Sequence, residues 1–193
     1  MRKLIPVLMI CAAVALFVAS PALAEEQPTS QELKEESKRV KIDEVAEETL
    51  QELFAKNANA KSLYDKAIGW AVFDNTKVAF GISGGGGNGV AVYKANGKRA
   101  YMKMGTGGVG LGIGVNKYQV VFFFESEKIL KKFIESGWQA DAGATASAGK
   151  ASAEAKTNFV NGLAIYQLTE KGLMANADIA GTKYWLNDKL NDE

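Results

Sequence analysis

The sequence contains no histidine and a single cysteine, Cys11. Cys11 lies inside an apolar run near the N-terminus, and this run is predicted to be removed, so the mature chain has no thiol either. Such a chain forms no disulfide and offers no thiolate or imidazole to a metal ion. It also lacks the Cys–His and Ser–His nucleophiles of many hydrolases. Enzymes and metal sites of these kinds are therefore excluded.

The first 24 residues predict a cleavable export signal. Arg2 and Lys3 give a positive end to an apolar run over residues 4–19, and Ala22-Leu23-Ala24 is a small-x-small cleavage site before Glu25. The run falls a little short of the about 20 residues of a membrane-spanning helix, so a retained anchor is the less favoured alternative. We expect an exported protein of the periplasm or envelope, without a retained transmembrane helix and without a lipid on Cys11.

The mature chain carries little net charge. Removal of Arg2 and Lys3 from the 23 basic residues leaves 21 against 22 acidic ones, a net charge of −1. This balance gives no electrostatic reason to expect a nucleic-acid partner. The length suits one domain with a hydrophobic core.

Residues 25–61 are rich in Glu and Lys and contain no glycine. Thr29 and Glu32 have the spacing of a capping box, which predicts the start of a helix. Apolar residues then recur at three- and four-residue steps, so they share one helical face, with glutamates largely on the others. These residues are Ile42, Val45, Ala46, Thr49, Leu50, Leu53 and Phe54. A second short helix is expected over residues 62–68, ending at Gly69.

From Trp70 onward the pattern is typical of β-structure. Asp74-Asn75, residues 84–88, Asn96-Gly97 and Asn116-Lys117 are interpreted as turns, and Asn96-Gly97 is a strong hairpin signal. Between these turns the predicted strands cover residues 70–73, 77–83, 89–94, 99–104, 109–115 and 118–124. The run Phe122-Phe123-Phe124 is expected in the core.

The rest of the chain predicts one helix and three more β segments. The helix covers residues 127–135, with Ser126 as its cap and Gly137 as its end. The β segments cover residues 138–147, 159–168 and 173–186, the last split near Gly181, and residues 149–158 are expected to form a loop.

Two stripes of small residues favour a curved sheet. Gly110, Gly112 and Gly114 alternate with branched apolar residues, and alanines alternate in the same way over residues 140–148. Bare faces of this kind let another backbone approach closely or let a sheet bend. The predicted fold class is α+β, with a mainly antiparallel, strongly curved or barrel-like sheet. An open sheet covered by helices is the alternative.

The motifs that suggest catalysis are weak. Residues 105–110 match G-x-G-x-x-G, but a strand follows them where a dinucleotide site needs a helix. Asp141 and Asp178 lie in β segments, where a solvated or turn-binding role is more common than acid–base catalysis. No two carboxylates have a recognisable catalytic spacing. We expect no enzymatic activity, no cofactor and no nucleotide.

Basic residues gather around the predicted Asn96-Gly97 hairpin. Lys98, Arg99 and Lys103 lie on it, together with Lys94. A solvated face explains such clusters in most proteins. The alternative is a cationic rim in which Lys98, Arg99 and Lys103 contact anionic lipid headgroups.

The ordered segments of the β region resemble the SYLF domain family. The resemblance covers about residues 62–186 and rests on five segments in family order. These are Gly69–Gly85, Gly107–Gly114, Val120–Phe124, Trp138–Ala144, and Lys171–Ala175 together with Ala180–Thr182. The family occurs in actin-patch proteins of yeast and animals and in many exported bacterial proteins.

This resemblance implies a β-rich domain that binds membrane lipids, phosphoinositides in the eukaryotic members, and implies no catalysis. We divide the chain into a signal peptide (1–24), a charged amphipathic helix (25–61), a SYLF-like domain (62–186) and a C-terminal tail (187–193). The expected function is non-catalytic binding of an anionic phospholipid or membrane surface in the bacterial envelope. The alternative is a structural or protein-interaction module of the periplasm, in which the acidic N-terminal helix contacts an envelope protein.

Overall fold

The computed structural model describes residues 28–139, 158–170, 172–174 and 181–191, and at Gly81 and residues 109–112 it describes the backbone alone. The predicted export signal and alanine stripe lie outside these residues. The strands are β1 (Gly69–Tyr93), β2 (Arg99–Phe124), β3 (Trp138–Gln139), β4 (Leu163–Thr169), β5 (Gly172–Met174) and β6 (Thr182–Leu186). The helices are α1 (Ser30–Lys56), α2 (Ala58–Lys66), α3 (Glu127–Ser136) and α5 (Asp188–Asn191).

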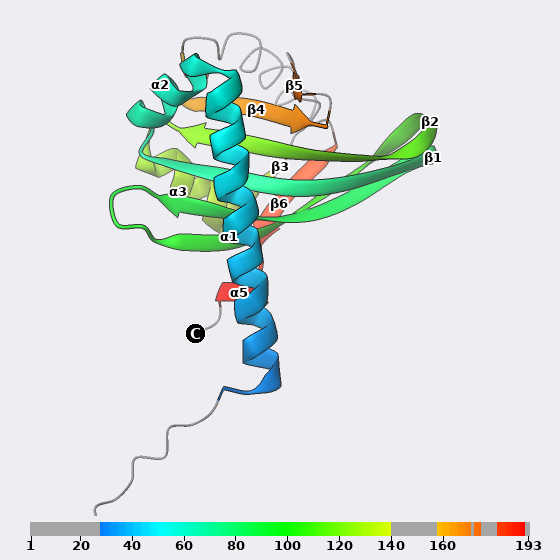
Figure 1. Cartoon of the computed structure of the whole chain (residues 1–193), viewed down its shortest axis with the longest axis horizontal. Helices are drawn as coiled ribbons and strands as arrows, with labels where there is room; N and C mark the ends of the chain where they lie inside the picture. Colours follow the sequence, from blue (N-terminus) through cyan, green and yellow to red (C-terminus); the bar gives the residue numbers. More distant parts are fainter. Residues whose placement is uncertain (1–27, 140–157, 171, 175–180, 192–193) are drawn as a thin grey trace, which may run out of the picture.

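The predicted α+β class with a curved antiparallel sheet is confirmed (Figure 1). The strands pair in the order β3-β6-β2-β4-β5, and β1 pairs with β2. This order has two ends, so the sheet of the described residues is curved but not closed into a barrel. None of the helices in this part of the chain is long and apolar enough to cross a membrane.

A long two-stranded ribbon of β1 and β2 organises the sheet. Its register runs from Gly69 opposite Phe124 to Val92 opposite Arg99, with one shift between Phe80 and Ile82. The Asn96-Gly97 turn joins the two strands as predicted, and Gly97 has a φ of +69°. Figure 1 shows that both strands run out to a tip and return to the body.

Three of the predicted turns are wrong because they lie inside this ribbon. Asp74 is opposite Gln119, Thr76 is opposite Lys117, and Gly86 is opposite Gly105. The pairing of β1 with β2 therefore continues through Asp74-Asn75, residues 84–88 and Asn116-Lys117. Cross-strand hydrogen bonding outweighs the local turn preference of these residues.

The glycines of β1 allow its two halves to lie against each other. A Cβ added at Gly87 would lie 1.9 Å from the Asp74 carbonyl oxygen, and one at Gly89 would lie 2.2 Å from that of Val72. Real Cβ atoms do not approach that closely, so these positions require glycine. The expected close approach at Gly114 is wrong, because a Cβ there would meet nothing within 4 Å. The side-chain surroundings of Gly110 and Gly112 lie outside the description.

The shorter strands extend the two halves of β2 separately. β4 pairs with residues 118–124 and carries β5, whereas β6 pairs with residues 102–106 and carries β3. The predicted split near Gly181 is confirmed, since β6 begins at Thr182. The predicted strands over residues 138–147 and 159–168 correspond to β3 and β4, and residues 140–157 lie outside the described residues.

The helices begin and end with the predicted signals in most cases. The Thr29 hydroxyl accepts a hydrogen bond from the Glu32 amide at 3.2 Å, and the full capping box is present. α3 ends at Gly137, which has a φ of +68°. α2 begins earlier than predicted because the Asn57 side chain caps it. α5 was not predicted.

Two apolar clusters fill the core on opposite faces of the sheet. α1 and α2 cover the first cluster with Leu50, Leu53 and Leu63, and α3 covers the second with Leu130 and Phe133. The predicted core position of Phe122-Phe123-Phe124 is confirmed, because all three are fully buried. Phe123 belongs to the first cluster, and its two neighbours belong to the second.

Candidate functional site

The three cations predicted to contact headgroups do not form one free cluster. Lys98 is exposed in the turn, Arg99 begins β2, and Lys103 lies further along β2, opposite Trp185 of β6. Within the described residues neither Lys98 nor Lys103 has an ion-pair partner. Arg99 does have one, and this contact gives it a structural role.

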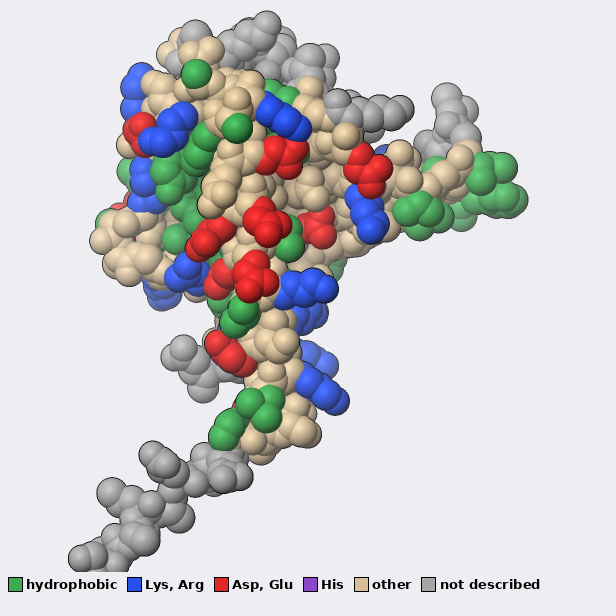
Figure 2. All heavy atoms as spheres, in the orientation of Figure 1, with side chains coloured by type: hydrophobic (Ala, Val, Ile, Leu, Met, Phe, Trp, Pro, Cys, Tyr) green, Lys and Arg blue, Asp and Glu red, His purple; other side chains and the backbone are tan. Residues whose placement is uncertain are grey.

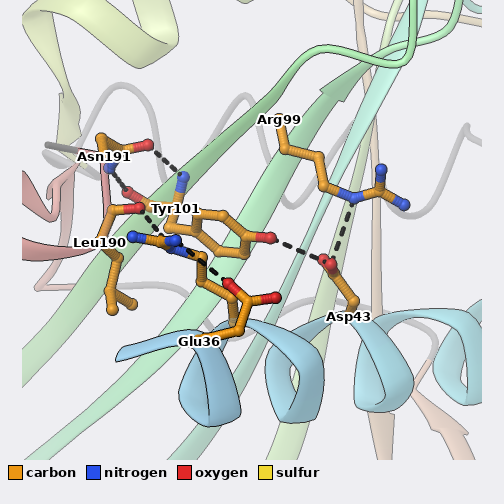
Figure 3. Close-up of polar contacts among 7 residues, drawn as sticks. Glu36, Asp43, Arg99, Tyr101, Leu190 and Asn191 are labelled. Carbon is orange, nitrogen blue, oxygen red and sulfur yellow. Dashed lines mark hydrogen bonds and ion pairs between the residues drawn. The ribbon is translucent and has the colours of Figure 1, made fainter. Parts of the chain in front are cut away.

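Arg99 and Tyr101 hold α1 on the ribbon through Asp43 (Figure 3). The Asp43 Oδ2 atom lies 3.3 Å from Arg99 Nε and accepts a hydrogen bond from the Tyr101 hydroxyl at 3.0 Å. Burial, followed by this hydrogen bond, raises the pKa of Tyr101 to about 12. The hydroxyl therefore remains a donor at neutral pH.

On the other side of Tyr101, α5 is attached to the same strand. The Tyr101 amide donates to Asn191 Oδ1 at 2.9 Å, and Asn191 Nδ2 donates to the Tyr101 carbonyl at 2.8 Å. Arg39 of α1 donates from Nε to the Leu190 carbonyl at 3.1 Å. No local pattern in the sequence predicts these contacts, because Asp43 and Asn191 lie in segments far from β2 along the chain.

These contacts border a groove of about 810 Å³ between α1, the turn and α5. Its lining includes Arg39, Lys98 and Arg99, and also the acidic residues Glu36 and Asp43. Arg39 is paired with Glu36 at 3.1 Å, and Arg99 is paired with Asp43. The turn end of the ribbon therefore mainly fixes α1 and α5, and Lys98 is exposed there without an ion-pair partner among the described residues.

The tip of the ribbon, where β1 and β2 bend back midway along their pairing, exposes large apolar side chains. Val78 lies opposite Val115 and Phe80 lies opposite Ile113, with Ile82 following after the register shift. Their exposed fractions are 50% for Val78, 73% for Phe80, 77% for Ile82, 82% for Ile113 and 64% for Val115. Figure 2 shows the hydrophobic patch at the end of the projecting ribbon. We call these five residues the apolar tip.

Two lysines flank the apolar tip. Lys77, paired with Asn116, adjoins the Val78–Val115 pair, and Lys117, paired with Thr76, lies one pair further from the tip. An exposed apolar patch with polar surroundings is typical of a surface that contacts a partner or a membrane. With lysines beside it, this tip can place apolar groups among acyl chains and cations among phosphates.

Sequence reasoning missed the tip although it noticed the pattern there. The alternation places Gly112 and Gly114 on one face of a strand and the branched residues on the other, but it does not predict that the branched face is exposed. In the structure Ile113 and Val115 are exposed at the tip of the ribbon. Periodicity identifies a face, but only the tertiary arrangement decides whether another layer covers it.

Comparison with known proteins gives two matches. A family model described as "Ysc84: Las17-binding protein actin regulator" matches residues 105–193. "Beta cell expansion factor A" of Aeromonas veronii is 42% identical over 154 residues, which are 80% of this chain and 59% of that protein. The chain thus spans less than two thirds of this relative. The matched segment contains most of β2 and all later elements, and over this segment the predicted resemblance to the SYLF (Ysc84) domain is confirmed.

Proposed function

We propose that this protein binds membrane surfaces through the apolar tip and catalyses no reaction. The observation that carries the proposal is the exposure of five large apolar side chains at the end of a projecting ribbon. Full burial of one such side chain stabilises by about 1.5–3 kcal/mol, so partial insertion of several is enough for reversible attachment. The anionic bacterial envelope is the proposed location, in agreement with the export signal expected from the sequence.

The electrostatic part of this attachment is assigned to Lys77 and Lys117 first. Both lie close to the tip, and a basic residue near an anionic surface contributes about 1 kcal/mol. Lys98, Arg99 and Lys103 lie at or toward the turn end of the ribbon, and Arg99 is paired with Asp43. We therefore expect this hairpin to contribute less than the tip to membrane binding.

Vesicle co-sedimentation tests the proposal with three variants. Phe80→Ser/Ile113→Ser removes the largest pair at the tip and should lower binding to anionic vesicles at least about tenfold. Leu33→Ser/Val40→Ser is the matched control, since these α1 residues are 56% and 46% exposed. It should bind as wild type does. Lys98→Glu/Arg99→Glu/Lys103→Glu should weaken binding less than the tip variant.

Two results would contradict the proposal. One is equal vesicle binding by the tip variant and the wild type, with unchanged thermal melting. The other is absence of wild-type binding to every vesicle composition. The second result would favour a protein-interaction module, for which the acidic side chains along the exposed side of α1 are the proposed contact (Figure 2).

A further inference from the structure

We propose that the hollow between α1 and the two halves of β1 binds the acyl chain of a single anionic amphiphile. The hollow has a volume of about 370 Å³ and lies on the side of α1 away from the Asp43 contact with Arg99. It is lined by Lys38, Lys41, Ile42, Val45, Ala46, Val72, Asp74, Asn88 and Gly89. This site is separate from the apolar tip, and the proposed function supplies the membrane from which its lipid would come.

The inner part of the hollow is apolar. Ala46 and Val72 are each 1% exposed and belong to the core cluster under α1, and Ile42 packs against that cluster. Gly89 contributes no side chain because the Val72 carbonyl lies too close for one. Because Ala46 on the helix is small and Gly89 on the strand has no side chain, a space remains between them that two larger residues would fill. A hydrocarbon chain there would extend the core and displace water from apolar surface.

The mouth of the hollow carries cations. Lys38 and Lys41 are one helical turn apart on α1, both are exposed, and neither has an ion-pair partner in the described part of the chain. Asp74 is also at the mouth, and its Oδ1 atom accepts a hydrogen bond from Gln119 Nε2 at 2.8 Å. The mouth thus has two ammonium groups and one carboxylate. Figure 2 shows basic side chains along the edge of α1 that faces the ribbon.

This arrangement selects a ligand by chemistry. The apolar inner part takes a chain, and the lysines favour a carboxylate or phosphate head over a neutral or cationic one. The volume is near the lower end of the about 300–1,000 Å³ typical of ligand pockets, which suits one chain rather than two. The ligand class is therefore a single-chain anionic amphiphile, or one chain of an anionic phospholipid.

Binding of dodecanoate below its micelle-forming concentration tests the site. Native mass spectrometry and titration calorimetry of the purified protein should show one dodecanoate bound and weaker binding of dodecyltrimethylammonium, which has the same chain and the opposite charge. Lys38→Glu/Lys41→Glu should weaken dodecanoate binding about 30-fold, from about 1 kcal/mol at each site. The matched charge control is Lys34→Glu/Lys66→Glu, because neither residue lines the hollow.

A second pair of variants tests the space itself. Val45→Trp fills the hollow from its half-buried rim and should abolish dodecanoate binding, whereas Val40→Trp, on another side of α1, should leave it within twofold of wild type. No binding by the wild type, or equal binding by Val45→Trp, would overturn the site. The tip variant Phe80→Ser/Ile113→Ser should lose vesicles but keep dodecanoate, so failure of the tip and failure of this site are distinguishable.

Discussion

Gly87 is a residue at which the two halves of β1 approach closely. We predict that Gly87→Ala destabilises the protein by about 1–3 kcal/mol, because its Cβ would overlap the Asp74 carbonyl and force the strands apart. Gly114→Ala is the control, since the same atom there meets nothing. Equilibrium urea denaturation measures both. Equal stability of the Gly87 and Gly114 variants would show that the two halves separate without cost.

At the scale of single residues the sequence predicted capping better than glycine roles. Thr29 and Glu32 act within four residues of each other, so their spacing was sufficient. A run such as Gly84 to Gly87 is compatible with a turn and with a close approach of strands. Which of the two forms depends on whether residues 72–76 pack against this run, and this packing joins positions that are not neighbours in the sequence.

At the scale of elements, α5 is held on β2 by a side chain that continues the ladder of hydrogen bonds. The pairing of β6 with β2 ends at Leu186 opposite Met102. At the next residue of β2, the side-chain amide of Asn191 forms hydrogen bonds with both the backbone N–H and the backbone carbonyl of Tyr101. We predict that Asn191→Ala lowers the free energy of unfolding by about 1–3 kcal/mol, because the Tyr101 amide loses its partner.

An exposed residue of the same helix, Lys189, provides the control for the Asn191 variant. Lys189→Ala, on the same helix, should unfold at the same urea concentration as the wild type. Amide hydrogen exchange supplies a second measurement, since Tyr101 should exchange faster in the Asn191 variant alone. Unchanged exchange at Tyr101 would mean that water replaces the side chain without loss.

The elements themselves were predicted unevenly for a physical reason. α1 and α3 have local signals at their ends and an apolar stripe between them, and both were found. The long ribbon was divided into six short strands because turn signals are local, whereas its pairing joins residues up to 55 positions apart, as for Gly69 and Phe124. The exposure of its tip likewise depends on which other elements pack on it, and a short stretch of sequence does not reveal this.

At the scale of the whole molecule, α1 separates a region of paired charges from a region with unpaired lysines among the described residues. Toward the turn it presents Asp43 and Glu36, which pair with Arg99 and Arg39. Toward the tip it presents Lys38 and Lys41 beside Asp74 and Asn88. The free cations of α1 and the apolar tip are thus on the same side of the helix. A membrane contacted by the tip would therefore face the lysines, and the side of α1 with paired charges would face away.

These surfaces are expected to act in the processed form of the protein. The Ala22-Leu23-Ala24 site predicts cleavage between Ala24 and Glu25 when the full chain is expressed in a bacterium with an envelope. N-terminal sequencing and intact mass decide this, and Ala22→Asp/Ala24→Asp should block processing. A mature chain that begins at Met1, or a lipid on Cys11, would contradict it. The result also decides how vesicle binding is interpreted, because a retained apolar run over residues 4–19 would bind membranes by itself and mask any change at the tip.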